Sequence, residues 1–144
     1  MNGLRLYGPV HLASSAVACW KCKKDTPVYA ICADDLEDFE DAEGGEPERM
    51  ETPVFVYEIA PEALPDSVVA ALAKAAPNYK PAFSRTVGDT SWANVCVHCG
   101  VLQGAFFLHN EPDGPFFGGP EEADVSRTLL SDDGFDVDSA SYTV

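Results

Sequence analysis

Two short stretches decide the fold of this chain: Cys19-Trp20-Lys21-Cys22 and Cys96-Val97-His98-Cys99. They contain four of its five cysteines. Because a tight turn joins the two cysteines of each stretch, both sulfur atoms can point at one cation. Two such turns supply four thiolates, a closed tetrahedral shell that suits Zn²⁺. The sequence therefore predicts one structural Zn²⁺ with the ligands Cys19, Cys22, Cys96 and Cys99.

The residues that follow the two pairs differ. Gly100 follows the second pair, and glycine allows the positive-φ turn that brings amide N–H groups toward sulfur. Lys23 stands at that position after the first pair, so a less typical turn is expected there. Lys21, Lys23 and Lys24 crowd the first pair, and their ammonium groups would stabilise the negative charge of a four-thiolate zinc centre.

Paired cysteine turns of this kind resemble the zinc-ribbon class, in which two turns at the tips of β-hairpins share one zinc ion. The resemblance covers residues 15–32 and 92–109. The departure is the 73-residue stretch from 23 to 95, far longer than the usual ribbon loop, so an inserted unit is expected to split the ribbon. The sequence around the pairs is also similar to that of small uncharacterised bacterial proteins, a likeness that implies no particular activity.

Acidic residues are concentrated in two segments of a chain whose net charge is −15 over 144 residues. Residues 34–51 hold ten acids against Arg49, and residues 111–138 hold nine acids against Arg127. This charge disfavours general nucleic-acid binding, which needs Lys and Arg for phosphate contacts, and it disfavours anionic membranes. It suits high solubility or a basic partner.

The cysteine pairs and the hydropathy predict a cytoplasmic protein. No apolar run approaches the ~20 residues of a membrane span. Polar residues interrupt the stretch 10–19, which disfavours a signal peptide ending at Cys19. In a reducing cytosol, paired Cys-x-x-Cys turns indicate metal ligands rather than disulfides. The alternative is thioredoxin-like redox chemistry, but Pro27 and the strand-like residues after Cys22 disfavour the helix that such a site needs.

The pattern of elements predicts one α+β domain, mostly β, over residues 1–144: a split zinc ribbon with an inserted strand–helix unit. Prolines bound the best strand, 53–59, and the helix, 61–76. The remaining expectations are strands at 4–18, 27–32, 92–97 and 102–108, an irregular stretch at 78–91, a solvated acidic loop at 34–51 and an acidic, loosely ordered tail at 120–144.

Several single residues carry alternative interpretations. Cys32 is interpreted as a small buried residue, with zinc ligation or a nucleophilic role as the alternatives. His98 is expected to point away from the metal, and Trp92 to cover the core. An enzyme site at His109-Asn110-Glu111, which would end a strand just before a turn, or at a reactive Cys32, is the alternative function. No phosphate-binding loop, His-Glu-x-x-His or Gly-x-Ser-x-Gly motif occurs.

The expected function is binding of a macromolecular partner, a protein of basic character, in an adaptor or inhibitor role. The expected contact residues are Trp20, Lys21, Asp38, Glu40, Asp41, Phe116 and Phe117. A nucleic-acid interface, which the overall charge disfavours, is the further alternative; it would use Arg5, Trp20, Lys21, Lys23 and Lys24. The sequence indicates no small-molecule substrate and no particular oligomeric state.

Overall fold

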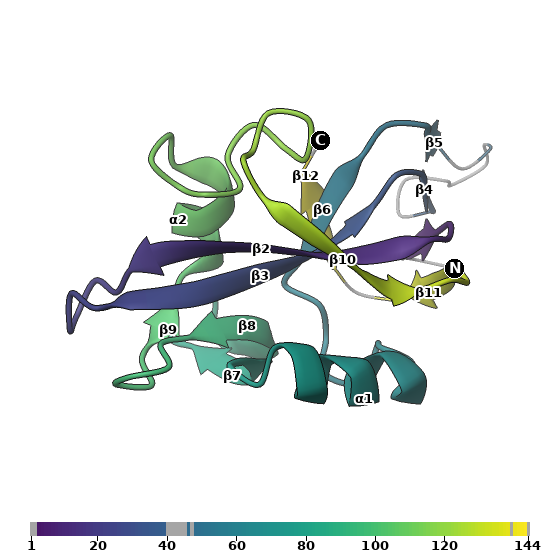
Figure 1. Ribbon diagram of the computed structural model, residues 1–144. Helices are drawn as coiled ribbons and strands as arrows, with labels where there is room; N and C mark the ends of the chain where they lie inside the picture. Colours follow the sequence, from purple (N-terminus) through teal and green to yellow (C-terminus); the bar gives the residue numbers. More distant parts are fainter. Residues whose placement is uncertain (1–2, 40–45, 47, 139, 144) are drawn as a thin grey trace.

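Three antiparallel sheets and two short helices make up the fold, which is α+β and mostly β, as the sequence predicts (Figure 1). The computed structural model describes residues 3–39, 46, 48–138 and 140–143. Neither helix in this part of the chain is long and apolar enough to cross a membrane.

The central sheet has five strands in the order β10-β2-β3-β6-β12. They are β2 (Val10–Ala18), β3 (Asp25–Ala33), β6 (Val54–Tyr57), β10 (Ser126–Ser131) and β12 (Ser141–Thr143). β2 and β3 pair along all nine residues of each, so they form a long hairpin whose turn carries the first cysteine pair. β6 lies between β3 and β12, which agrees with a central position for this apolar strand.

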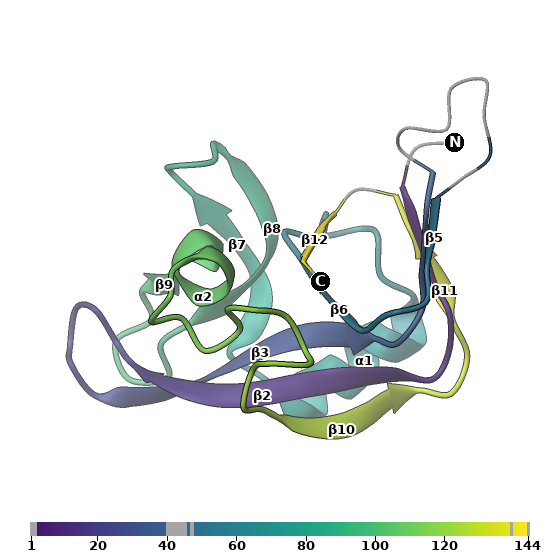
Figure 2. The ribbon, with the colours of Figure 1, turned by 90° about the horizontal axis from the view of Figure 1, so that it is seen from above.

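A second sheet closes the end of the molecule opposite the tip of this hairpin (Figure 2). Its order is β11-β1-β4-β5, formed by β1 (Leu4–Leu6), β4 (Leu36–Asp38), β5 (Glu48–Met50) and β11 (Phe135–Val137). The acidic segment 34–51 therefore contributes two paired strands, where a solvated loop was expected. Its residues 40–45 and 47 lie outside the described residues.

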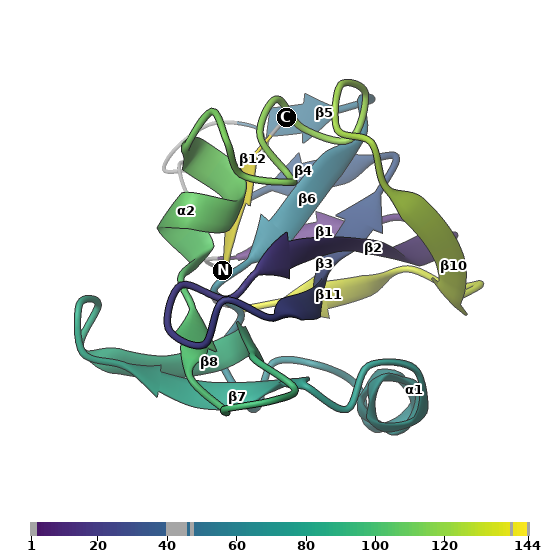
Figure 3. The ribbon, with the colours of Figure 1, turned by 60° about the vertical axis from the view of Figure 1, so that its left-hand side comes forward.

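The third sheet carries the second cysteine pair. It consists of β7 (Tyr79–Ser84), β8 (Asp89–Val95) and β9 (Leu102–Gln103). Helix α1 (Asp66–Ala75) lies on the same side of the central sheet as β7 and β8, whereas helix α2 (Ala105–Asn110) lies on the other side (Figure 3). Pro65 precedes α1, so the proline-bounded helix is confirmed with a later start.

Alternation along β3 explains how the central sheet is buried on both faces. Ile31 packs into one core cluster, together with Val68 and Leu72 of α1. Cys32, the next residue, packs into a second cluster with Phe55 on the opposite face. Successive side chains of a strand point to opposite faces, so a continuously apolar strand fits this position. Burying Val68 or Leu72 stabilises the fold by roughly 1.5–3 kcal/mol each.

Three expectations about secondary structure are wrong. The stretch 78–91 is the β7–β8 hairpin, whose first strand is mostly exposed and so lacks an apolar pattern. Residues 105–108 begin α2, because a short apolar run fits a helix as well as a strand. The tail from 120 supplies β10, β11 and β12, which are short or exposed strands with weak periodicity.

Candidate metal centre

The two cysteine turns have the same backbone hydrogen bonds. We call residues 19–24 the first knuckle and residues 96–101 the second knuckle. In each knuckle, the backbone N–H of the first cysteine donates to the carbonyl of the residue five positions later. The carbonyl of the same cysteine accepts from the N–H of the residue four positions later. The bonds are Cys19 N to Lys24 O, Lys23 N to Cys19 O, Cys96 N to Val101 O and Gly100 N to Cys96 O, each 2.9 Å.

Equivalent positions in the two knuckles take positive φ. Gly100 has φ 77°, as the sequence predicts. Lys23 has φ 66° at the matching position. The first knuckle therefore adopts the same turn as the second although it lacks glycine, at a cost that is ordinarily about 1–2 kcal/mol for a residue with a Cβ. The Lys23 ammonium donates to the Trp20 carbonyl at 2.7 Å, which ties this residue to its own turn.

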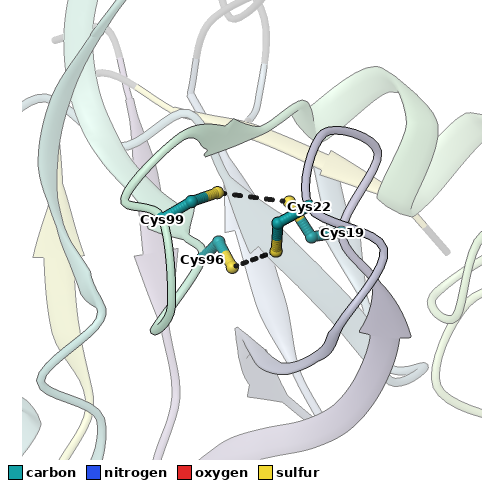
Figure 4. Close-up of side chains that lie close together, drawn as sticks. All are labelled: Cys19, Cys22, Cys96 and Cys99. Atoms are coloured by element: carbon teal, nitrogen blue, oxygen red, sulfur yellow. Dashed lines mark hydrogen bonds between the residues drawn. The ribbon is translucent and has the colours of Figure 1, made fainter.

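The folded chain brings all four predicted ligands together (Figure 4). The sulfur atoms of Cys19, Cys22, Cys96 and Cys99 lie within 4.8 Å of one another. Cys19 and Cys99 are separated by 3.6 Å, and Cys22 and Cys96 by 3.7 Å. A tetrahedral ion with metal–sulfur bonds near 2.3 Å requires about 3.8 Å along each edge. These cysteines are therefore positioned to bind one metal ion.

Hydrogen bonds from outside the sulfur cluster favour the thiolate form of Cys19 and Cys96. At Cys22 a backbone hydrogen bond from Lys24 is outweighed by burial and by the neighbouring thiols, which raise the pKa to about 11. The backbone N–H of Lys21 donates to Cys19 Sγ at 3.4 Å, and that of His98 donates to Cys96 Sγ at 3.4 Å. The Gln103 amide also donates to Cys19 Sγ at 3.4 Å. Burial opposes ionisation of Cys19, but backbone and side-chain hydrogen bonds outweigh it and lower its pKa to about 6. The pKa of Cys96 is lowered by the same balance.

Buried polar side chains join the second knuckle and its sheet to β3 independently of the cysteines. Asn94 accepts from Tyr29 N at 2.8 Å and donates to Tyr29 O at 2.9 Å, which continues the strand pairing of β3 through a side chain. Asn78 donates to the carbonyls of Pro27 and Val95. Thr26 Oγ1 accepts from Val97 N at 3.1 Å. Cysteine spacing did not single out these residues; the only sequence signal is polar residues within strand-like or turn segments.

The proposed contact residues divide between surface and core. Trp20 is 60% exposed, yet its indole N–H donates to Leu102 O at 2.8 Å, so the ring is held against the start of β9. Lys21 is exposed, and Phe117 is 44% exposed. Phe116 is fully buried beside Phe55, so it belongs to the core, and its expected contact role does not fit.

The acidic contact residues also need correction. Asp38 is buried and accepts a hydrogen bond from the Tyr142 hydroxyl at 2.8 Å, so it does not present its charge to a partner. Asp34 and Asp35 pair with arginines of the same chain. Glu40 and Asp41 lie outside the described residues. In contrast, all nine acids of segment 111–138 are exposed, and among them only Asp136 forms a salt bridge within the described residues.

The residues named for an enzyme site do not converge. His109 is 4% exposed, and burial lowers its pKa to about 3, whereas Asn110 and Glu111 are exposed. Cys32 is fully buried in the second core cluster, and burial raises its pKa to about 11, which fits the structural interpretation and not a nucleophile. His98 is exposed and donates to Asp25 O at 3.0 Å, away from the sulfurs.

Comparison with protein-family models, with curated proteins and with solved structures finds no match for this chain. The four-cysteine cluster is compatible with a zinc-ribbon-like site on geometry alone.

Proposed function

We propose that the four-cysteine centre binds one Zn²⁺ and that this ion is structural. The clustering of four cysteine sulfur atoms within 4.8 Å of one another is the observation that carries the proposal. Four thiolates leave no open position for a substrate, and Zn²⁺ favours such a closed shell. The ion would hold the tip of the β2–β3 hairpin against the β8–β9 turn, as in a zinc ribbon split by the segment that contains β6 and α1.

Elemental analysis tests the metal. Protein purified without added metal should contain about one equivalent of zinc. The Cys32→Ala variant should retain that equivalent, because Cys32 lies in the core and outside the cluster. The Cys96→Ser variant should lose most of it. A folded wild-type protein that contains no metal would overturn the assignment.

We further propose that the chain is an adaptor or inhibitor that binds a protein partner of basic character in a reducing cytoplasm. Support for this comes from the exposed acids of segment 111–138. Three arginines, Arg5, Arg49 and Arg127, are each paired with an aspartate, so little positive charge in the second and central sheets offsets these acids. A field of one sign steers an oppositely charged partner toward the surface that carries it.

The most suitable contact surface lies around the edge strand β10. The exposed acids Glu121, Glu122 and Asp124 precede this strand, and Asp132 and Asp133 follow it. A groove of about 620 Å³ lies beside it, with Asp124 and the hydroxyl residues of β2 and β10 in its wall. β10 pairs with β2 alone among the described strands, so its other edge has backbone groups that can bind an extended basic segment.

Two experiments test this role. Co-purification followed by mass spectrometry identifies the partner, and the rate of association with that partner is then measured. Association should slow as salt rises from 0.1 M to 1 M, because the screening length falls from about 10 Å to about 3 Å. Neutralising Glu121, Glu122 and Asp124 together should slow it as well, at unchanged zinc content. The matched control neutralises three exposed acids elsewhere, Glu46, Glu51 and Glu62. An association rate that changes neither with salt concentration nor in either triple variant would overturn the proposal.

A further inference from the structure

Two buried side-chain atoms in the described part of the chain have no hydrogen-bond partner: the hydroxyl oxygen of Tyr79 and Nδ1 of His109. Each side chain is 4% exposed. Buried polar groups in folded proteins are nearly always paired, with protein or with ordered water, because an unpaired group loses its hydration without compensation. Both atoms therefore need a partner that the protein itself does not supply.

The two residues that carry these atoms line the same cavity. It lies where strands of the central and third sheets meet α2, and its volume is about 20 Å³. On this measure one water molecule needs roughly 10–15 Å³. The cavity thus has room for one water and not for a metabolite. Trp92 and Leu108 contribute apolar wall, so the polar partners are few and well defined.

The other amide side chains in the wall are already engaged. Asn94 uses both ends of its amide on the backbone of Tyr29. Gln103 directs its amide N–H groups at Cys19 Sγ and Val101 O. Neither amide forms a hydrogen bond with the Tyr79 hydroxyl or with His109 Nδ1, so these two atoms stay unpaired among the described residues.

We propose that this cavity binds one internal water molecule, which hydrogen-bonds the Tyr79 hydroxyl and His109 Nδ1 and thereby joins β7 to α2. The water would also lie directly behind the metal centre, because Gln103 lines the cavity and contacts Cys19.

The chemistry of the two groups suits water. Tyr57 stacks on one side of the His109 ring at 4.1 Å between centroids, and Phe116 stacks at 5.1 Å, so the ring plane is fixed. Burial keeps the imidazole neutral by lowering its pKa to about 3, so one ring nitrogen donates and the other accepts. Water carries two donors and two acceptors, and it can serve Nδ1 in either tautomer together with the tyrosine hydroxyl. Glu58 is the one acid among the lining residues.

The sign of the Tyr79→Phe effect on stability tests the proposal. If the water is present, loss of the hydroxyl removes a hydrogen bond, and the folding equilibrium constant should fall roughly threefold to tenfold. If the hydroxyl is unpaired, its removal leaves the constant unchanged or raises it. Tyr57→Phe is the matched control, because Tyr57 lines the same cavity but its hydroxyl is not among the buried unpaired atoms of the described residues. This control should change the constant less than roughly twofold.

A crystal structure of the wild-type protein provides the second measurement, which does not depend on how a variant folds. One water should lie roughly 2.6–3.2 Å from both the Tyr79 hydroxyl and His109 Nδ1. A direct Tyr79–His109 hydrogen bond, an ion or larger ligand in the cavity, or a Tyr79→Phe variant at least as stable as wild type would each overturn the assignment.

Discussion

Cys96→Ser should destabilise the protein far more than Cys32→Ala, although both residues are buried and both changes remove one sulfur atom. Cys96 is 2% exposed within the metal centre, whereas Cys32 is fully buried against Phe55 in the core. The comparison therefore separates the loss of a metal ligand from the loss of a buried thiol at similar burial.

The expected magnitudes follow from these surroundings. Structural zinc contributes roughly 10–16 kcal/mol to the folding of small zinc domains, so an equal share for one of four thiolates, roughly 2.5–4 kcal/mol, is the least that Cys96→Ser should cost when the variant also loses the ion. Cys32→Ala deletes one heavy atom from a packed cluster, which costs on the order of 1 kcal/mol. Because a domain of this length loses about 3 °C in melting temperature per kcal/mol, we expect a loss of about 3 °C for Cys32→Ala and a loss of at least about 8–12 °C for Cys96→Ser.

The assay is thermal and urea unfolding of the wild-type protein, Cys32→Ala and Cys96→Ser. The zinc content of each protein is measured alongside. Asn78, Asn94 and Thr26 hydrogen-bond the third sheet to β3 without the metal, so Cys96→Ser need not unfold completely. Equal losses in the two variants would refute the reasoning, since the cluster would then be no more than a set of buried thiols.

Three further predictions concern other parts of the fold. The folded pKa of His109, about 3, lies below the unfolded value of about 6.5, so the stability that this residue contributes is complete above pH 6.5 and falls as pH drops toward 3. The free energy of unfolding, measured with urea, should therefore fall by about 2 kcal/mol between pH 7.5 and pH 5 through this residue. The variant His109→Phe should abolish this loss, and the control Glu58→Gln should preserve it. Gly100→Ala, at φ 77°, should lower the free energy of unfolding by about 1–2 kcal/mol. Gly104→Ala, at φ −63° with open space around it, should leave the free energy of unfolding unchanged or raise it by up to about 1 kcal/mol. The melting temperatures of the two variants test this difference. Chelation should lower the melting temperature of wild type but not that of Cys96→Ser, and equal shifts would contradict the metal assignment.

Local signals predicted the parts of the structure that local physics determines. The spacing of the four cysteines predicted a metal cluster whose two pairs are separated by 73 residues of sequence. The proline-bounded runs at 53–59 and 61–76 predicted β6 and α1, because an apolar strand or an amphipathic helix shows its period within its own residues.

Elements that depend on distant partners could not be predicted in this way. β11 pairs with β1 in the register Leu4 to Val137, and β12 pairs with β6 through Thr143 and Phe55. Each of these strands has only three residues, too few for alternation or composition to distinguish it from a loop. Tertiary pairing creates them.

The burial of individual side chains could not be predicted from the sequence either. The acids of segment 34–51 look alike in the sequence, yet Asp35 forms a salt bridge with Arg49 while Asp38 is buried against Tyr142. Phe116 and Phe117 are adjacent and identical in type, but one fills the core and the other is 44% exposed. Which neighbour faces the core depends on the path of the chain after α2, and composition does not encode that path.

The segment once expected to be a loose acidic tail is the segment best placed to form a rigid binding surface. Its strands complete both the central and the second sheets, so the bend that carries Asp132 and Asp133 is held between β10, which pairs with β2, and β11, which pairs with β1. A partner that docked on a disordered tail would have to order it, at a cost of roughly 1–2 kcal/mol per residue. Acids in the short segments that flank paired strands avoid much of that cost, because folding has already ordered the strands at their ends. Electrostatic steering from such a surface should therefore raise the association rate without the entropic penalty of coupled folding.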